Sequence, residues 1–274
     1  GRSPLNLREL LALQTKGAVA MAARAMWKGV IVLGEERIAV KLYAAVESRG
    51  IAFHLLHDQD LERVKQRLVS SSGKTVATDE VQKAMEVDDD TFVVLDDEEL
   101  EQLQPTASRD IEVMQVVAAS EVPHSLFERP YWLGPDGDGS ESYFALAAAL
   151  AKEQQVAIAQ WVMRNKEYVG AISERDGYLM LITLRHRGEV IDAGQLEPPA
   201  GRQLSREERQ MAKQLVNALS GKFDPTEYRD EYVESVKELI EAKAQGKSLP
   251  ARPKPRQRKS QSLAASLKAS LKRL

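Results

Sequence analysis

Residues 26–43 read MWKGVIVLGEERIAVKLY, and this stretch decides the fold. Apolar and polar residues alternate through 26–33 and again through 37–43, on either side of the charged turn at 34–36. Alternation with a period of two is typical of a half-buried β-strand, and a short turn between two such runs is typical of a hairpin. The stretch therefore predicts an antiparallel β-hairpin with one face toward a core.

Further strand-like runs follow at short spacing along the chain. They cover residues 51–56, 91–95, 111–117, 156–164, 168–173 and 178–185. The last two are separated by Asp176-Gly177, a dipeptide typical of hairpin turns. Many strands with few long helices between them favour an antiparallel barrel or sandwich over a parallel sheet. One Ala- and Leu-rich helix is expected at 142–152, packed on this barrel.

The hydrophobic period changes to 3.6 after the Pro- and Gly-containing link at 196–202. Ser205 and Glu208 form a capping box ahead of a first helix, and Asp224 with Pro225 predicts the start of a second. The expected apolar stripes of these helices are Met211, Leu215 and Leu219, and then Tyr228, Tyr232, Val236, Leu239 and Ile240. Two amphipathic helices after a barrel predict a helical arm at 201–246.

The charges of the chain are divided unevenly between a body and a tail. Residues 247–274 carry nine basic side chains and no acidic one, whereas the rest of the chain carries 29 basic and 41 acidic side chains. The net charge of −3 thus hides a body of charge −12 and a cationic tail. Such asymmetry is typical of proteins that bind a polyanion, usually nucleic acid, because Lys and Arg displace counterions from phosphate. A tail that only aids solubility is the alternative.

The tail itself has two parts. Residues 249–259 are rich in proline and basic residues, which predicts a disordered, extended linker. Residues 262–274 place leucines at helical spacing with basic residues between them. This pattern predicts a short basic amphipathic helix that forms on a partner or on DNA.

The composition excludes several classes of protein. With 274 residues, 43% of them apolar and 29% charged, the chain has the composition of one large or two ordinary globular domains. The absence of cysteine excludes disulfides, thiolate nucleophiles and Cys-based metal centres. No apolar run approaches the roughly 18 residues of a membrane span, so we expect no membrane partner. Residues 1–20, which precede Met21, are expected to be a disordered leader outside the fold.

Three patterns that resemble catalytic or metal-binding motifs are incomplete. Residues 71–75 (SSGKT) resemble the end of a phosphate-binding loop, but Leu68 stands where its first glycine belongs, which favours a turn between strands. His54 and His57 have the spacing of metal ligands without further ligands marked by the sequence, which favours a structural role. Residues 79–101 contain eleven acidic side chains. A solvated surface is favoured there, and a metal-dependent nuclease stays open as an alternative. We expect no active site, no metal site and no cofactor.

Basic residues are spread over the predicted strands. On a half-buried strand they occupy the exposed face, so several of them can line one surface. This pattern is typical of proteins that hold the phosphate backbone without reading base identity. The candidates for DNA contact are Arg24, Lys28, Lys41, Arg164, Arg185 and Arg187.

Motifs that occur in order along the chain resemble the bacterial Ku proteins of non-homologous end joining. They begin with RAMWKGVI at 24–31 and IAVKLY at 38–43, and continue with PYWL at 130–133 and VMRN at 162–165. The last is ELIEAK at 238–243, so the resemblance covers about residues 21–247. The turn at 33–40, LGEERIAV, departs from the family pattern because it is more acidic and lacks a proline.

The resemblance implies an α+β fold, mainly of antiparallel strands. It places a Ku-like β-barrel core with bridging strands at 21–200, followed by the helical arm at 201–246 and a disordered basic tail at 247–274. It also implies a ring-shaped homodimer without catalysis that is threaded by a double-stranded DNA end and protects it. Such a protein recruits and stimulates an ATP-dependent DNA ligase with polymerase activity, in the bacterial cytoplasm and in association with the nucleoid.

The basic tail is the second candidate contact surface, for DNA or for the ligase. Its candidate residues are Lys254, Arg256, Arg258, Lys259, Leu263, Leu267, Lys268, Leu271, Lys272 and Arg273. The alternative function is a docking scaffold for a ligase or polymerase. In that case DNA binding is secondary, independent of ends and carried by the tail.

Overall fold

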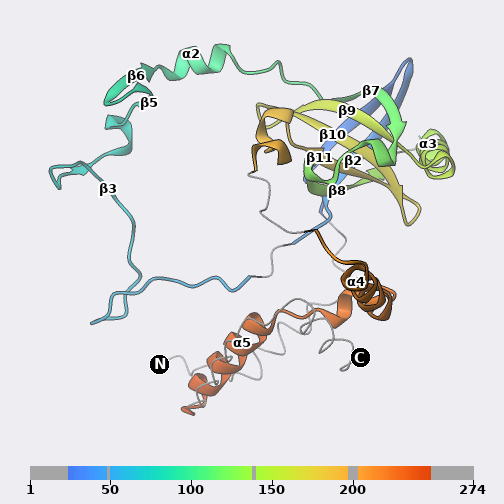
Figure 1. Cartoon of the computed structure of the whole chain (residues 1–274). Coiled ribbons are helices and arrows are strands. Elements are labelled where there is room, and N and C mark those ends of the chain that lie inside the picture. The colour runs from blue at the N-terminus through green and yellow to red at the C-terminus, as the bar shows by residue number, and fades with distance from the viewer. Residues whose placement is uncertain (1–23, 48–49, 138–139, 197–202, 248–274) are drawn as a thin grey trace. The chain divides into compact units, whose positions relative to one another are not determined.

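The computed structural model describes residues 24–47, 50–137, 140–196 and 203–247 (Figure 1). These residues divide into two compact units. The first holds residues 24–47, 54–137 and 140–193, and the second holds 50–53, 194–196 and 203–247. The predicted leader at 1–20 and all ten candidate contact residues of the tail lie outside the described residues.

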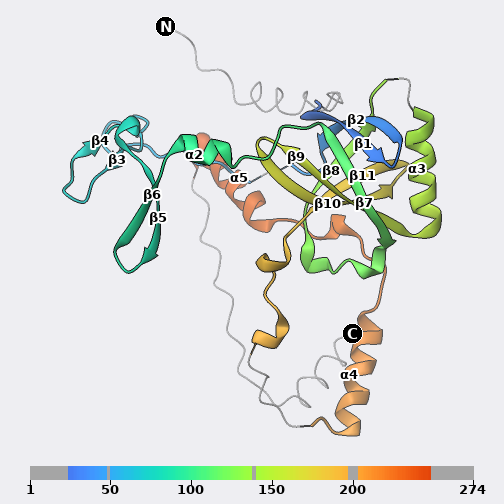
Figure 2. The same cartoon turned by 90° about the horizontal axis from the view of Figure 1, so that it is seen from above.

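The first unit is built on a closed barrel of seven strands (Figure 2). In spatial order they are β1 (Trp27–Leu33), β2 (Glu36–Ala44), β8 (Phe127–Pro135), β11 (Tyr178–Leu184), β10 (Lys166–Arg175), β9 (Gln155–Met163) and β7 (Asp110–Ala118). Neighbouring strands are antiparallel except β1 and β7, whose parallel pairing closes the barrel. A barrel or a sandwich was predicted, and the barrel is confirmed, together with one parallel pair that the sequence did not indicate.

The core of this unit lies inside the barrel and under one helix. Inward-facing residues such as Ile31, Leu42 and Leu181 are fully buried. The helix α3 (Ser140–Glu153) packs on the barrel, and its Tyr143 belongs to the same buried cluster. The Tyr143 hydroxyl donates to the Leu133 carbonyl of β8 and accepts from the Leu179 amide of β11 at 2.8 Å. The predicted helix at 142–152 is therefore confirmed, with slightly wider bounds.

Two strands of the first unit were not predicted. β8 contains Pro130 and Pro135 at positions where a sequence-based prediction demotes a strand. Pro130 is tolerated because it stands opposite Ile182, next to the shift in register between β8 and β11, where ladder hydrogen bonding is irregular. The strand β5 (Lys83–Asp88) was missed because acidic and basic residues interrupt its apolar positions.

The segment that joins β2 to β7 is extended and exposed, and we call residues 50–108 the bridge segment. It holds the hairpins β3 (Leu68–Val69) with β4 (Thr75–Val76) and β5 with β6 (Thr91–Leu95), and the helix α2 (Asp97–Gln102). The turn at 71–75 is confirmed. The strand predicted at 51–56 is wrong, because these residues form no ladder beyond an isolated bridge from Leu56 to Arg63.

The second unit contains the helices α4 (Arg206–Leu219) and α5 (Glu231–Ala244). The predicted capping box opens α4: the Ser205 hydroxyl accepts from the Glu208 amide at 3.2 Å, and the Glu208 carboxylate accepts from the Ser205 amide at 2.9 Å. The predicted start of the next helix at Asp224 is wrong. Asp224 caps only a short 3-10 turn, and α5 begins after Asp230, whose carboxylate accepts from the Val233 amide at 3.0 Å.

The remaining short elements are 3-10 turns. They are Thr78–Glu80, Ala119–Glu121, His124–Leu126, Arg187–Glu189, Ala193–Gln195 and Pro225–Glu227. Among the described residues, no helix has the length and apolar character that crossing a membrane requires.

Candidate nucleic-acid interface

The strand directions give the barrel two chemically different ends. At one end, β1, β7, β8 and β10 begin, and β2, β9 and β11 finish. We call this the cationic end, because basic residues precede or follow most of these strands: Arg24, Arg109, Arg164, Lys166, Arg185 and Arg187. The acids there include Asp110 and Glu167.

The opposite end of the barrel holds the β1–β2 and β10–β11 turns and the start of β9. Its acidic residues include Glu35, Glu36, Glu153, Glu174 and Asp176, and its basic residues include Arg37, Lys152 and Arg175. A charge asymmetry of this kind is typical of a surface that attracts a polyanion at one end. A negative net charge of the whole body is therefore compatible with one phosphate-binding face.

Lys28 and Lys41 stand directly opposite each other on the outer face of β1 and β2. Like charges at such a position repel, and Asp136, just past β8, offsets the repulsion. Its carboxylate accepts from Lys41 at 2.6 Å and from Lys28 at 2.9 Å. The hydrogen bond from Lys41, followed by the one from Lys28, holds the pKa of Asp136 below its ordinary value. The bond to Asp136 in turn raises the pKa of Lys41. The two predicted cations are thus brought together, with an acid between them.

Arg185 and Arg187 are placed at the cationic end but have internal partners. The Arg185 guanidinium donates to the carbonyls of Phe127 at 2.5 Å and Ser125 at 3.3 Å. It thereby ties the segment before β8 to the end of β11. Arg187 forms an exposed ion pair with Asp192 at 3.0 Å. Both side chains therefore have structural partners that the sequence pattern did not indicate.

Arg164 occupies the two-residue turn between β9 and β10, where Met163 pairs with Lys166. Together with Arg109 it lines a hollow next to Trp27. Sequence reasoning missed Arg109, because its position beside Arg164 depends on the pairing of β7 with both β1 and β9. Arg24 is exposed just ahead of β1.

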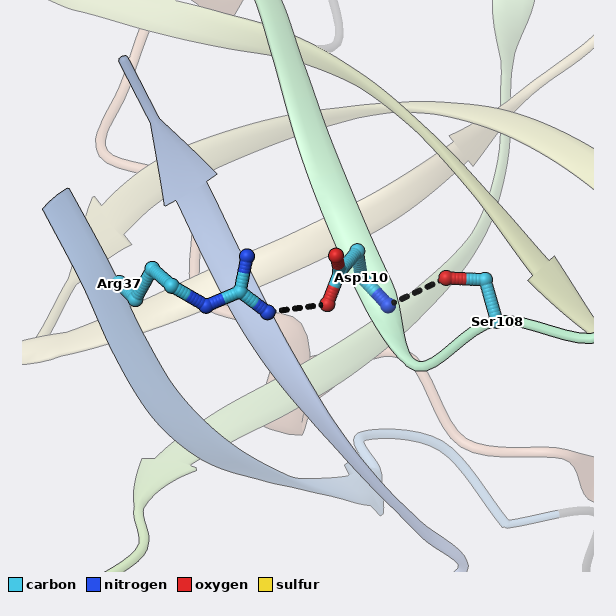
Figure 3. A network of polar contacts seen from close by, with 3 residues as sticks. All are labelled: Arg37, Ser108 and Asp110. Atoms are coloured by element: carbon cyan, nitrogen blue, oxygen red, sulfur yellow. Dashed lines mark hydrogen bonds and ion pairs between the residues drawn. The ribbon is translucent and has the colours of Figure 1, made fainter. Parts of the chain in front are cut away.

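The backbone around Arg109 is held by a polar network (Figure 3). Arg37 of β2 reaches across β1 and donates to the Asp110 carboxylate at 2.7 Å. The Asp110 amide donates to the Ser108 hydroxyl at 3.0 Å, and the Arg109 carbonyl accepts from the Val30 amide at 2.8 Å. These contacts join three strands of the barrel and set the direction in which the chain enters β7.

The alternative chemistries gain no support from the described part of the chain. The acidic run at 79–101 is spread over the 3-10 turn at 78–80, β5, the β5–β6 turn and the segment 96–101 that includes most of α2, and its acidic side chains are exposed. The His57 ring contacts the Asp60 carboxylate at 2.9 Å. Among the described residues, His54 and His57 do not belong to any group of three possible metal ligands. Within the described residues, no three His, Cys, Asp or Glu side chains come together in a way that would hold a metal ion.

Comparison with known proteins agrees with this architecture. Residues 33–215 match the family model described as Ku: Ku70/Ku80 beta-barrel domain. A protein of Anaeromyxobacter sp. (strain K), named non-homologous end joining protein Ku, is 38% identical over 231 residues, which cover 84% of this chain and 78% of the relative. A protein of Geotalea uraniireducens (strain Rf4), named non-homologous end joining protein Ku 2, is 36% identical over 230 residues, which cover 84% and 89%.

A third relative is similar over most of its length. The non-homologous end joining protein Ku of Archaeoglobus fulgidus is 34% identical over 230 residues, which cover 82% of this chain and 90% of the relative. The matched region contains six of the seven barrel strands, the bridge segment and most of α4. The chain therefore belongs to the Ku family.

Proposed function

We propose that this protein binds the ends of double-stranded DNA without sequence preference, as a ring-shaped homodimer, in the repair of double-strand breaks by non-homologous end joining. Its task is to protect the end and to recruit and stimulate an ATP-dependent DNA ligase with polymerase activity, at the bacterial nucleoid in the cytoplasm. It carries out no catalysis of its own. Membership of the Ku family supports the role in end joining.

The observation that carries the proposal is the exposure of the bridge segment. All of β5 is exposed, as is β6 except for its last residue. Register places Phe92 and Val94 on one face of this hairpin, and Met85 and Val93 on the other. Each of these four side chains is about half exposed or more. An isolated two-stranded hairpin is marginally stable in water, and a large exposed apolar patch marks an interaction site.

A second copy of the chain is the partner that this segment fits best. Apolar residues on both faces, together with unpaired strand edges, allow two bridge segments to cover each other while each barrel keeps its own core. A closed arrangement of two copies leaves an opening that only a DNA end can enter. The cationic end then supplies contacts to phosphate, which carry no sequence information.

The test of end binding compares one DNA in two topological forms. The full chain is titrated into linear duplex and into the same duplex as a covalently closed circle, at near-physiological salt, and complexes are separated by gel shift. Strong binding to the linear form alone supports threading. Equal binding to both forms contradicts it and favours the docking scaffold that binds DNA through the tail.

The patch around Asp136 allows a test with effects of opposite sign. Replacing Lys28 and Lys41 together by glutamine is expected to weaken binding to all duplexes. It should also reduce the log-log salt slope by about 0.9 for each phosphate that the protein no longer neutralises. Asp136→Asn is expected to strengthen binding, because it frees both ammonium groups from their acid partner. Arg175→Gln, at the opposite end of the barrel, is the matched control. Unchanged affinity in all variants would remove this patch from the interface.

The contribution of the tail to the stimulation of the ligase is tested separately. Deletion of residues 248–274 is expected to reduce stimulation of ligation while leaving thermal unfolding of the remaining chain unchanged. If the same deletion abolishes every interaction with DNA, the docking scaffold with secondary DNA binding becomes the better description.

A further inference from the structure

The cationic end of the barrel contains a hollow of about 310 Å³. It is lined by Trp27 at the start of β1, by residues 107–109 ahead of β7, and by residues 162–165 at the β9–β10 turn. These three segments are far apart in sequence. The parallel pairing of β1 with β7 and the antiparallel pairing of β7 with β9 bring them side by side.

Two arginines, Arg109 and Arg164, are among the residues that line this hollow. Among the residues that the structure describes, neither is paired with a carboxylate. Three cations on the strands differ in this respect: Lys28 and Lys41 share Asp136, and Arg37 binds Asp110. Two like charges in one hollow repel each other, and a bound anion would offset that repulsion. The hollow therefore suits a phosphate group, which arginine binds in a bidentate manner.

The turn that presents Arg164 is locally unfavourable. Arg164 and Asn165 have φ values of 53° and 59°, in the left-handed region. Two-residue hairpin turns of this kind favour Asn or Asp followed by Gly, as at Asp176-Gly177 in the next hairpin, with φ values of 53° and 83°. Arginine is disfavoured in that region by the contact between its Cβ and the backbone. Strained backbone of this kind clusters at ligand sites, where the side chain has a task.

Trp27 adds an aromatic wall to the same hollow. Its indole rests on Gly29, where a Cβ would lie only 2.2 Å from Cζ3 of the ring. The missing side chain of Gly29 thus makes room for the indole. The segment ahead of β7, which also lines the hollow, is held by the Arg37–Asp110–Ser108 network (Figure 3). An indole face stacks with any of the bases, so it contributes binding without sequence preference.

The size of the hollow decides between a bare phosphate and a larger ligand. One water occupies about 30 Å³ of the liquid, so a hollow of about 310 Å³ has room for a group larger than a single small ion. We propose that the hollow receives one nucleotide of an unpaired strand at a DNA end, with its phosphate at Arg109 and Arg164 and its base against the indole of Trp27. The inference rests on the proposed function and deepens it: an end with a single-stranded overhang makes a contact that a blunt end lacks.

The experiment compares duplexes of equal paired length with blunt ends or with a short overhang, using the full chain and fluorescence anisotropy. The overhang carries 2-aminopurine as an unpaired base, whose fluorescence falls when it stacks on an indole. We expect the overhang duplex to bind about tenfold more tightly, which is the scale of one base stacked on an aromatic side chain, and the 2-aminopurine signal to be quenched. Equal affinities with no quenching overturn the inference, whereas they leave end binding itself intact.

Variants assign the effect to the hollow through the ratio of the two affinities. Arg109→Gln and Arg164→Asn are each expected to bring the ratio toward one, whatever they do to blunt-end binding. Asparagine tolerates the left-handed conformation at 164, so loss of the ratio in that variant does not reflect misfolding. Arg175→Asn in the β10 strand at the opposite end is the matched control, with the ratio unchanged. A ratio that survives both hollow variants overturns the assignment.

A last arm distinguishes the source of the nucleotide. Free deoxyadenosine monophosphate is added in competition with the overhang duplex. We expect the free nucleotide to compete only at a concentration far above that of the DNA ends, because the contact is made by a nucleotide tethered to the bound duplex. Competition at equal concentration would mean a free-nucleotide site and would overturn the proposal. If neither duplex binds at all, the proposed function fails, and the inference fails with it.

Discussion

The barrel and the bridge segment belong to one chain, but the barrel buries its apolar residues and the bridge segment leaves them exposed. In the barrel, Ile31, Leu133 and Ile172 are fully buried. In the bridge segment, Phe92 and Met85 remain 58% and 65% exposed, although they belong to regular strands. The barrel closes its sheet and therefore has no free edge, whereas each hairpin of the bridge segment leaves two edges open. Burial in the barrel is intramolecular, whereas these apolar residues of the bridge segment stay exposed in the single chain.

From this difference we infer that the barrel supplies stability, and we propose that the bridge segment supplies assembly. A fully buried core residue contributes to the unfolding free energy of the single chain, and truncation leaves a cavity. An exposed apolar residue on a hairpin contributes little until a second surface covers it. Substitutions in the two regions should consequently change different measured quantities.

The largest expected effect is on the barrel core. Ile172→Ala removes a fully buried side chain of β10 and is expected to lower the unfolding free energy by about 2–5 kcal/mol, as measured by urea denaturation. The matched truncation Val94→Ala in β6, where the side chain is 50% exposed, should change the unfolding free energy of the barrel by less than about 0.5 kcal/mol. Similar losses for the two variants would break the comparison.

The next effect is on self-association. Phe92→Asp together with Val94→Asp places charges on one face of the β5–β6 hairpin, and desolvating them costs free energy in any interface that covers this face. We expect at least about tenfold weaker dimerisation by sedimentation equilibrium, which corresponds to about 1.4 kcal/mol. Unfolding of the barrel should be unaffected.

Tyr178→Asp provides the control for this variant. Tyr178 is also about half exposed, but it lies at the start of β11 in the barrel, at the end opposite the cationic end. Its replacement is expected to leave the association constant unchanged. If the control weakens association as much as the bridge variant does, the dimer uses the barrel surface and the role given to the bridge segment is wrong.

The smallest effect concerns two ion pairs, one in each region. On the barrel, the pKa of Asp136 is lowered by its bonds to Lys41 and Lys28, so its contribution to stability is present above the unfolded value of about 3.9. The contribution is lost as the pH falls through the lower folded value. Asp136→Asn should therefore flatten the loss of thermal stability in acid.

The matched pair in the bridge segment is Lys83 with Asp97, at 2.8 Å and with both side chains largely exposed. The bond to Asp97 raises the pKa of Lys83, so any contribution is complete below the unfolded value and is lost only at strongly alkaline pH. Asp97→Asn should leave the acid limb of the stability curve unchanged, because exposed pairs contribute little. An equal response of the two variants would show that the ion pairs of Asp136 contribute no more to stability than an exposed surface pair does.

Local patterns predicted those elements whose cause is local. The hairpin at 26–43 is confirmed because alternation marks β1 and β2 directly. The Asp176-Gly177 turn and the Ser205–Glu208 capping box are confirmed because each depends on residues at most three positions apart. Where two local signals competed, prediction went wrong: Asp224 and Asp230 are both suitable caps, and only the second opens a full helix.

Among the candidate site residues, the sequence could nominate cations but not their partners. Arg185 binds the Phe127 carbonyl, and Lys28 shares Asp136 with Lys41 although Asp136 is more than 90 residues away from either. Arg109 was missed because it precedes a strand whose neighbours in the barrel are β1 and β9. No spacing rule along the chain reports such pairings.

The sequence by itself determined the family, the mainly antiparallel β architecture with a helical arm, and the division of charge between an acidic body and a basic tail. These properties follow from motif order, hydrophobic period and composition, which depend only on the order and the types of residues in the chain. Only the tertiary structure decided that the barrel closes through the parallel pair of β1 and β7, that the basic residues gather at one end, and that Arg109, Arg164 and Trp27 share a hollow. The physical reason is that barrel closure sets strand direction and register together, and these bring residues from distant segments to the same rim.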